Sequence, residues 1–229
     1  MKFGVIVFPG SNCDMDMIYV LKNILKKNVV KLWHKDTDLK KCDVIILPGG
    51  FSYGDYLRSG AIAKFSPIMK EVLGFANAGG YVMGICNGFQ ILTECGLLPG
   101  ALLHNNSHKF ICKNTNLKII SKNSPLTKLC NKDVIKIPIA HAEGRYYANK
   151  KTIEELISND QILFKYCRED GSINNDVNPN GSLLNIAGIC NKERNVYGMM
   201  PHPERAADNE LSNQDGKILF ESIIESFAN

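Results

Sequence analysis

Three short apolar runs, each punctuated by glycine, constrain the fold of this chain more than any other feature of its sequence. They are FGVIVF (3–8), DVIILPGG (43–50) and YVMGI (81–85). A short apolar run without polar alternation is typical of a strand buried on both faces, as in a parallel sheet. VVKLW (29–33) predicts one more strand. Parallel neighbours need crossover connections, so the pattern predicts a parallel sheet covered by helices.

Helical spacing of apolar residues separates these strands. A first helix is expected after Asn12, because Met17, Ile18 and Leu21 follow at helical spacing. Two more are expected over 59–80 and 87–96, each ending at glycine, and a last one over 215–229. Further strand-like runs, separated by turn signals, predict some antiparallel pairing. They lie at 117–121, 133–141, 161–167, 184–190 and 195–200.

These elements predict an α/β fold, a flavodoxin-like and mostly parallel sheet flanked by helices, with a smaller antiparallel region. No repeat, low-complexity segment or linker interrupts the chain, so a single domain over residues 1–229 is expected. The net charge is only +4 and no long basic block occurs, which argues against nucleic-acid binding. No apolar run approaches the ~18–20 residues of a membrane span.

Eight cysteines are scattered along the chain without any C-x-x-C pair. Neither a disulfide scaffold nor a metal site is therefore expected. This cysteine usage is typical of a reducing compartment, and the N-terminal apolar stretch is too short for a signal peptide. The sequence thus predicts a cytoplasmic protein.

One cysteine stands out because glycines flank it, in GICNG (84–88). A strand, then G-x-C-x-G, then a helix is the context of a nucleophile elbow with Cys in place of Ser. The sharp turn would strain Cys86 and expose its side chain, and the helix N-terminus would favour its thiolate. A buried cysteine in an ordinary turn is an equally good interpretation of the motif alone.

A cysteine nucleophile also needs a base, and the base needs a group to orient it. The stretch MMPHPERA (199–206) offers both. Pro203 pushes His202 out of the helical region, so an extended stretch is expected. His202 and Glu204 would then share one side, with Cα atoms about 6–7 Å apart. In isolation this motif would suit a solvated His–Glu pair on a turn; the elbow upstream favours a triad.

Backbone amides near the elbow are expected to stabilise a developing oxyanion. The N–H of Asn87 follows the nucleophile directly, and LPGG (47–50) ends a buried strand with two glycines. We therefore predict that Gly50 and Asn87 form the oxyanion hole. A plain turn would explain the glycine pair as well.

Six motifs together resemble the class I, triad-type glutamine amidotransferases. They are FPGSNCD (8–14), PGGFSYGDYLRSGAIA (48–63), CNGFQIL (86–92), GLLPGAL (96–102), HAEGRYY (141–147) and GMMPHPERA (198–206). Within that class, their order is similar to that in the family of glutaminase subunits of phosphoribosylformylglycinamidine synthase, from purine biosynthesis. The resemblance spans nearly the whole chain. Ala142 replaces the glycine of that family's commoner HGEGR.

The resemblance implies a catalytic triad of Cys86, His202 and Glu204. Cys86 would attack the side-chain amide of glutamine, and His202 would hand a proton to the departing ammonia. Glu204 would orient His202, and a thioester intermediate would then be hydrolysed. Gln90, one helical turn beyond Cys86, would contact the amino-acid end of the substrate.

The resemblance also places other residues near the pocket or a subunit interface. Asn106, Phe110 and His141 are expected to help bind substrate, although loop hydrogen bonds, core packing or a satisfied histidine would explain them. Asp55 and Arg58, three residues apart, are expected to pair with each other or with a partner.

The resemblance finally implies partners, because the chain carries no ATP-binding signature. A large synthetase subunit and a small third subunit are expected. The synthetase would use ATP and Mg²⁺ with the ammonia to make formylglycinamidine ribonucleotide, and this chain itself would bind no cofactor. Three alternatives stay open: a glutaminase for another synthetase, an elbow-cysteine hydrolase, and a non-enzymatic flavodoxin-like binding module.

Overall fold

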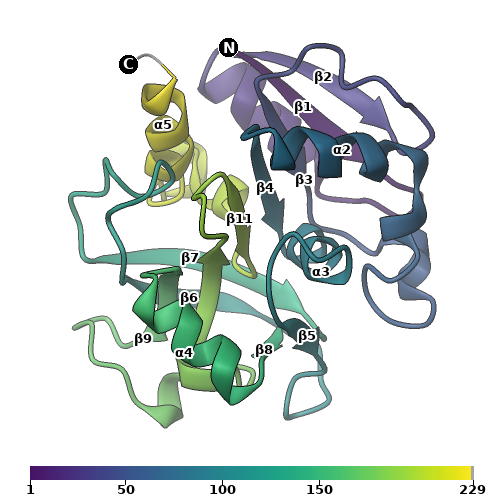
Figure 1. The fold of residues 1–229 in the computed structure, drawn as a ribbon. Coiled ribbons are helices and arrows are strands. Elements are labelled where there is room, and N and C mark those ends of the chain that lie inside the picture. The colour runs from purple at the N-terminus through teal and green to yellow at the C-terminus, as the bar shows by residue number, and fades with distance from the viewer. Residues whose placement is uncertain (228–229) are drawn as a thin grey trace.

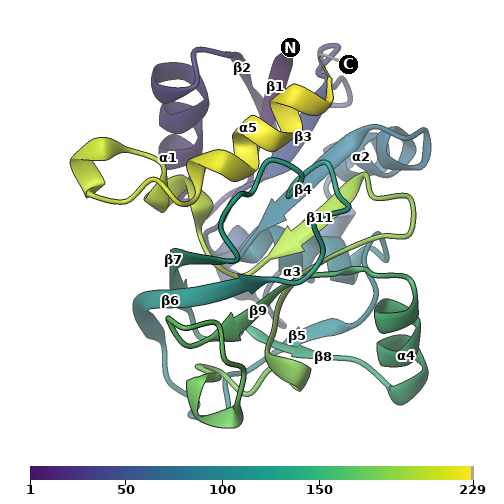
Figure 2. The same cartoon turned by 90° about the vertical axis from the view of Figure 1, so that its left-hand side faces the viewer.

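The computed structural model describes residues 1–227, and over that range nine strands form one mixed sheet (Figures 1 and 2). Their order is β2-β1-β3-β4-β11-β10-β9-β6-β7. The pairings from β2 to β11 are parallel. The parallel strands are β1 (Lys2–Val7), β2 (Asn28–Trp33), β3 (Val44–Leu47), β4 (Tyr81–Ile85) and β11 (Val196–Met199).

The second half of the sheet is antiparallel. It contains β10 (Ile186–Cys190), β9 (Ile162–Cys167), β6 (Ile111–Ile119) and β7 (Val134–His141). Two short strands, β5 (Ala101–Leu103) and β8 (Arg145–Tyr147), form a separate antiparallel pair. The predicted α/β class is confirmed, with an antiparallel part that has as many strand pairings as the parallel part.

Helices cover both faces of the parallel half (Figures 1 and 2). They are α1 (Asp14–Tyr19), α2 (Pro67–Asn77), α3 (Asn87–Glu94) and α5 (Lys217–Ser226). Helix α4 (Lys150–Ser158) lies beside the antiparallel half (Figures 1 and 2). Helix α1 continues as a π-helix over Val20–Ile24, and α1 and α2 lie on opposite faces. The last helix was predicted over 215–229, of which residues 228 and 229 lie outside the described part.

The prediction of one helix over 59–80 is wrong for its first part. Helix α2 begins only at Pro67, because the proline ring pushes Ser66 into an extended conformation, with φ −62° and ψ 140°. The chain before α2 is a loop with short 3₁₀ turns at Ser52–Asp55 and Ala63–Phe65, and its first part is called loop 51–61 below. Tyr53, Asp55 and Leu57 have φ of 55°, 54° and 69° in it, which is costly for residues with side chains.

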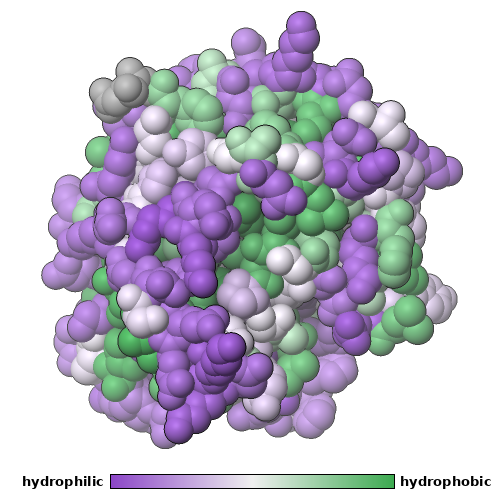
Figure 3. Space-filling view, in the orientation of Figure 1, coloured by the Kyte–Doolittle hydropathy of each residue, from purple (hydrophilic) through white to green (hydrophobic). Residues whose placement is uncertain are grey.

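The hydrophobic core follows the sheet from end to end. Strands β3, β10 and β11 are buried along their whole length, as the continuous apolar runs predict. On the face seen in Figure 1, apolar residues gather in the middle of the view, over the region of α3, and polar residues surround them (Figure 3). Among the described residues, no helix is both long and apolar enough to cross a membrane.

Candidate active site

The elbow predicted at Cys86 forms between β4 and α3. Cys86 has φ 51° and ψ −105°, a strained conformation for a residue with a side chain. The flanking glycines permit it, because a Cβ on Gly88 would lie 1.9 Å from the Leu47 carbonyl oxygen and one on Gly84 would lie 2.6 Å from the Gly88 backbone. Cys86 is only 5% exposed, so the expected exposure of its side chain is wrong: the elbow forms, but the thiol is buried.

The pairing of β4 with β11 brings the distant histidine to this elbow. Ile85 pairs with Met199 in parallel register, and the Cys86 N–H donates to the Met199 carbonyl over 2.8 Å. Both strands therefore end at the same edge of the sheet. A third strand contributes from the antiparallel half, because the His202 N–H donates to the Pro138 carbonyl of β7 over 2.8 Å.

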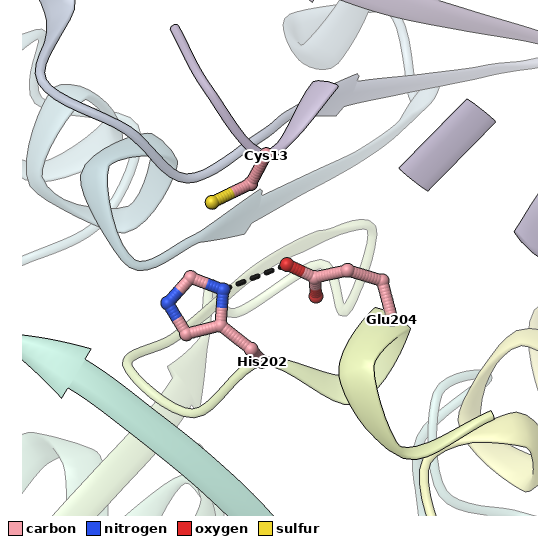
Figure 4. A group of neighbouring side chains, drawn as sticks. All are labelled: Cys13, His202 and Glu204. Carbon is pink, nitrogen blue, oxygen red and sulfur yellow. Dashed lines mark hydrogen bonds and ion pairs between the residues drawn. The ribbon is translucent and has the colours of Figure 1, made fainter. Parts of the chain in front are cut away.

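His202 and Glu204 form the acid–base pair expected from the sequence. His202 Nδ1 lies 2.7 Å from Glu204 Oε1, and the two residues are 1% and 2% exposed (Figure 4). The predicted extended conformation is correct for His202 but not beyond it, because Pro203–Ala206 form a 3₁₀ turn. Proline suits the first position of such a turn, and the turn folds Glu204 back onto the imidazole.

The electrostatics of the pair favour a charged His202. Burial disfavours the imidazolium, but the Glu204 carboxylate and the Cys86 sulfur outweigh this and raise the pKa of His202 well above its usual value. Nδ1 is engaged by Glu204, and Nε2 is buried without a hydrogen-bond partner in the described residues. Nε2 is therefore the atom left to exchange a proton with a substrate.

Cys13 lies beside this pair, a contact that sequence reasoning missed (Figure 4). Donor atoms of Cys13, His202 and Glu204 all lie within 4.8 Å of one another. Arg205 also donates to the Cys13 sulfur over 3.2 Å, and Arg205 in turn pairs with Asp16. A soft metal ion could bind such a donor set. The hydrogen bond between His202 and Glu204 already explains the group as an acid–base pair.

The two predicted oxyanion donors, Asn87 and Gly50, lie in different surroundings. Asn87 is the first residue of α3, so its N–H has no acceptor within the helix. The glycine pair after β3 packs on His202, because a Cβ on Gly49 would lie 2.6 Å from the imidazole Cε1. Gly50 has φ 141° and bridges to Ser11.

Gln90 is buried one turn beyond Cys86, as predicted, and its side chain is held at both ends. Its Oε1 accepts from Asn87 Nδ2 over 2.9 Å, and its Nε2 donates to the Glu143 carbonyl over 2.6 Å. The same Asn87 side chain accepts from the Ser52 N–H over 3.1 Å, which ties loop 51–61 to α3.

The other three predicted pocket residues have different surroundings. His141 is buried, and Asn105 lies 3.1 Å from its Nδ1; burial and nearby His202 lower the pKa of His141 to about 4, so it stays neutral. Asn106 is exposed, with a backbone bond to Asn180. Phe110 is 51% exposed, and its ring lies 6.5 Å from that of Phe51.

Sequence reasoning passed over the buried neighbour of Asn106. The Asn105 amide bonds the carbonyls of Lys109 and His141, and its oxygen accepts from the Gly144 N–H. Asn105 therefore shapes the turn that holds His141 and Glu143. The NN pair (105–106) in the sequence carries no signal that would separate the buried residue from the exposed one.

The family comparison agrees with this geometry. A family model described as a CobB/CobQ-like glutamine amidotransferase domain matches residues 1–223. The crystal structure of a glutamine amidotransferase from Thermotoga maritima matches 98% of this chain and 90% of its own, with a TM-score of 0.57; at 13% identity it shows the fold alone. The fold and the site therefore define a glutamine amidotransferase.

Closer relatives narrow the family. A phosphoribosylformylglycinamidine synthase subunit PurQ from Koribacter versatilis is 56% identical over 229 residues, covering 100% of this chain and 99% of the relative. The corresponding subunit from Aquifex aeolicus is 53% identical over 225 residues, covering 98% of this chain and 99% of the relative. The structure of PurLQS from Thermotoga maritima matches 99% of this chain and 98% of its own, with 42% identity and a TM-score of 0.86. The chain belongs to the PurQ family.

Proposed function

We propose that this chain is the glutaminase subunit of a phosphoribosylformylglycinamidine synthase. It hydrolyses glutamine through Cys86, His202 and Glu204 and supplies ammonia to a synthetase subunit. The relatives that span the whole chain carry that name. The observation that carries the proposal is the strained Cys86 beside a buried His202–Glu204 pair joined over 2.7 Å.

In the first half-reaction, the Cys86 sulfur attacks the side-chain amide carbon of glutamine. A C–S bond forms, and the carbonyl oxygen takes the negative charge, which the N–H groups of Gly50 and Asn87 stabilise. His202 then gives the proton on Nε2 to the amide nitrogen. The C–N bond breaks, ammonia leaves, and a γ-glutamyl thioester remains on Cys86.

In the second half-reaction, His202 is neutral and acts as a base. It takes a proton from water, and the resulting hydroxide attacks the thioester carbon. The C–S bond breaks, glutamate leaves, and the Cys86 sulfur and the His202 imidazolium are restored. Glu204 keeps Nδ1 protonated throughout, which leaves Nε2 to carry each proton.

Ammonia must then reach a second active site before water protonates it. We propose a synthetase subunit that makes formylglycinamidine ribonucleotide with ATP and Mg²⁺, together with a small third subunit. The name PurLQS of the matching Thermotoga maritima structure supports such an assembly. The nucleotide and the metal bind the synthetase, and this chain needs no cofactor of its own. We place the complex in the cytoplasm, a reducing compartment that suits the free cysteines of this chain.

Replacing Cys86 in the complete complex tests the proposal. Cys86→Ala should abolish glutamine-dependent synthesis and leave ammonia-dependent synthesis unchanged, because only the source of ammonia is lost. Cys112→Ala, at an exposed cysteine outside the elbow, is the matched control. Glutamate release by Cys86→Ala at the wild-type rate would refute the triad. An equal loss of ammonia-dependent synthesis would refute the division of labour.

A further inference from the structure

Two carboxylates flank the start of α3, close to Gln90 and one turn from Cys86. Asp55 comes from loop 51–61, and Glu143 comes from the turn between β7 and β8. Asn87 Nδ2 lies 3.5 Å from Asp55 Oδ1. The Ser59 N–H donates to Glu143 Oε2 over 3.3 Å, and the Glu143 carbonyl accepts from Gln90.

These contacts close into a ring of side-chain and backbone groups around Gln90. Asn87 joins Gln90 to Asp55, Gln90 joins Asn87 to Glu143, and Ser59 joins Glu143 back to the loop that carries Asp55. Both carboxylates are only partly buried, so a ligand can reach them. The ring thus presents two negative groups beside the residue expected to contact the amino-acid end of the substrate.

No lysine or arginine neutralises Asp55 in the part of the chain that the structure describes. The expected Asp55–Arg58 pair does not form, because Arg58 makes two bonds to Glu94, of 2.6 and 2.8 Å. Lys64 pairs with Glu94 as well, over 3.6 Å. Besides the Ser59 N–H, Glu143 contacts the exposed His104, at 3.3 Å. Arg58 and Lys64 thus pair with Glu94, and Arg58 interacts with Glu143 only at longer range.

Two further observations indicate that the ring fits a polar ligand. Burial and the charge of Glu143 raise the pKa of Asp55 to about 6, which a bound cation would reverse. Ser52, whose N–H binds Asn87, is buried, and its hydroxyl has no partner among the described residues. A buried polar atom of this kind is costly unless a ligand or water satisfies it.

The spacing suits the amino-acid end of the substrate. Glutamine extends about 5 Å from its side-chain amide carbon to its α-nitrogen, given four bonds of roughly 1.5 Å. One helical turn, about 5.4 Å, separates the level of Cys86 from that of Gln90. A glutamine attached at Cys86 and running along α3 therefore brings its amino-acid end to the ring. The negative charges of Asp55 and Glu143 favour the α-ammonium group there over the α-carboxylate.

We propose that Asp55, together with Glu143, binds the α-ammonium group of glutamine and so makes the site specific for an α-amino acid amide. This inference rests on the proposed function, because it takes glutamine as the substrate. Loop 51–61 holds Asp55 in position through the Ser52–Asn87 bond. The strained conformation of Asp55 is then the cost of presenting its carboxylate to the substrate.

Glutaramate, which is glutamine without the α-amino group, separates this role from a structural one. In the complete complex, Asp55→Asn should raise the KM for glutamine by about tenfold to a hundredfold, the usual effect of losing one charge-assisted hydrogen bond. The inhibition constant of glutaramate should not change. Asp55→Glu, which restores the charge, should recover much of the preference for glutamine.

Binding to a catalytically dead enzyme checks the result without chemistry. In a Cys86→Ser background, calorimetry should show that Asp55→Asn weakens glutamine binding and leaves glutaramate binding unchanged. Glu143→Gln should act in the same direction. Asp133→Asn, at an exposed carboxylate paired with Lys122, is the matched control and should change neither ligand.

Two outcomes would overturn the inference. Equal weakening of glutamine and glutaramate would mean that Asp55 only shapes the loop, and no weakening of either would mean that Asp55 does not meet the substrate. Both outcomes differ from a failure of the proposed function. In that case the wild-type complex would hydrolyse no glutamine, and no KM could be measured at all.

Discussion

Glu204→Gln isolates the charge of the triad's third member. Glutamine has nearly the same shape as glutamate, so the 3₁₀ turn Pro203–Ala206 and the contact with His202 can persist. The variant loses the negative charge that holds the imidazolium. The pKa of His202 should therefore fall, because burial then acts without the main opposing charge.

The size of the effect follows from the geometry of the pair. Hydrogen bonds to charged groups contribute about 1.5–3 kcal/mol, and buried short ones lie at the upper end. The bond from His202 Nδ1 to Glu204 Oε1 is 2.7 Å long between side chains that are 2% and 0% exposed. About 3 kcal/mol corresponds to roughly a 150-fold loss in kcat/KM for glutamine.

The assay compares two nitrogen sources in the complete complex. Glu204→Gln should slow glutamine-dependent synthesis by that factor and leave ammonia-dependent synthesis at the wild-type rate. Glu210→Gln, an exposed glutamate six residues on, is the control and should change neither. The reasoning fails if Glu204→Gln keeps wild-type glutamine activity, or if both activities fall together, since a general folding defect would cause the latter.

Two stability predictions follow from the same structure. Gly88→Ala should cost about 3 kcal/mol in urea unfolding, because its Cβ would meet the Leu47 carbonyl at 1.9 Å; Gly74→Ala, with open space around it, should stabilise α2 by about 1 kcal/mol. A similar loss of stability in Gly88→Ala and Gly74→Ala would refute the steric explanation. Asp55→Asn should raise the free energy of unfolding by about 1 kcal/mol near pH 7. The pKa of Asp55 is raised to about 6 because the folded state disfavours its ionised form. Below about pH 4 the carboxyl is protonated in both the folded and the unfolded state, so the gain in stability should vanish there. An equal gain at about pH 7 and about pH 4 would contradict this prediction.

The elbow at Cys86 and the contact between His202 and Glu204 could be predicted because their signals are local. Glycines around Cys86 and prolines around His202 mark the backbone at each point, and both signals can be recognised within a few residues of sequence. The meeting of the two segments depends on the parallel pairing of β4 with β11. Nothing in either strand specifies that partner, so their proximity rested on the family resemblance.

The parts that escaped prediction depend on contacts between distant segments. Asp55 and Arg58 look like a local pair in the sequence. In the structure the Arg58 guanidinium instead donates to Glu94, which lies 36 residues away along the chain. The contact between Cys13 and the triad likewise joins opposite ends of the chain. Helix α4 is a different case. Asn149 caps it through Thr152, a local signal that the sequence does carry.

The position of β11 between β4 and β10 has a consequence for synthesis on the ribosome. Cys86 emerges more than a hundred residues before His202, which at about 5–20 residues per second is a delay of roughly 6–23 s. Until β11 arrives, β4 has an open apolar edge, which is an aggregation hazard that chaperones would need to cover. The nascent chain therefore carries an idle thiol, and glutamine hydrolysis begins only when the sheet is complete.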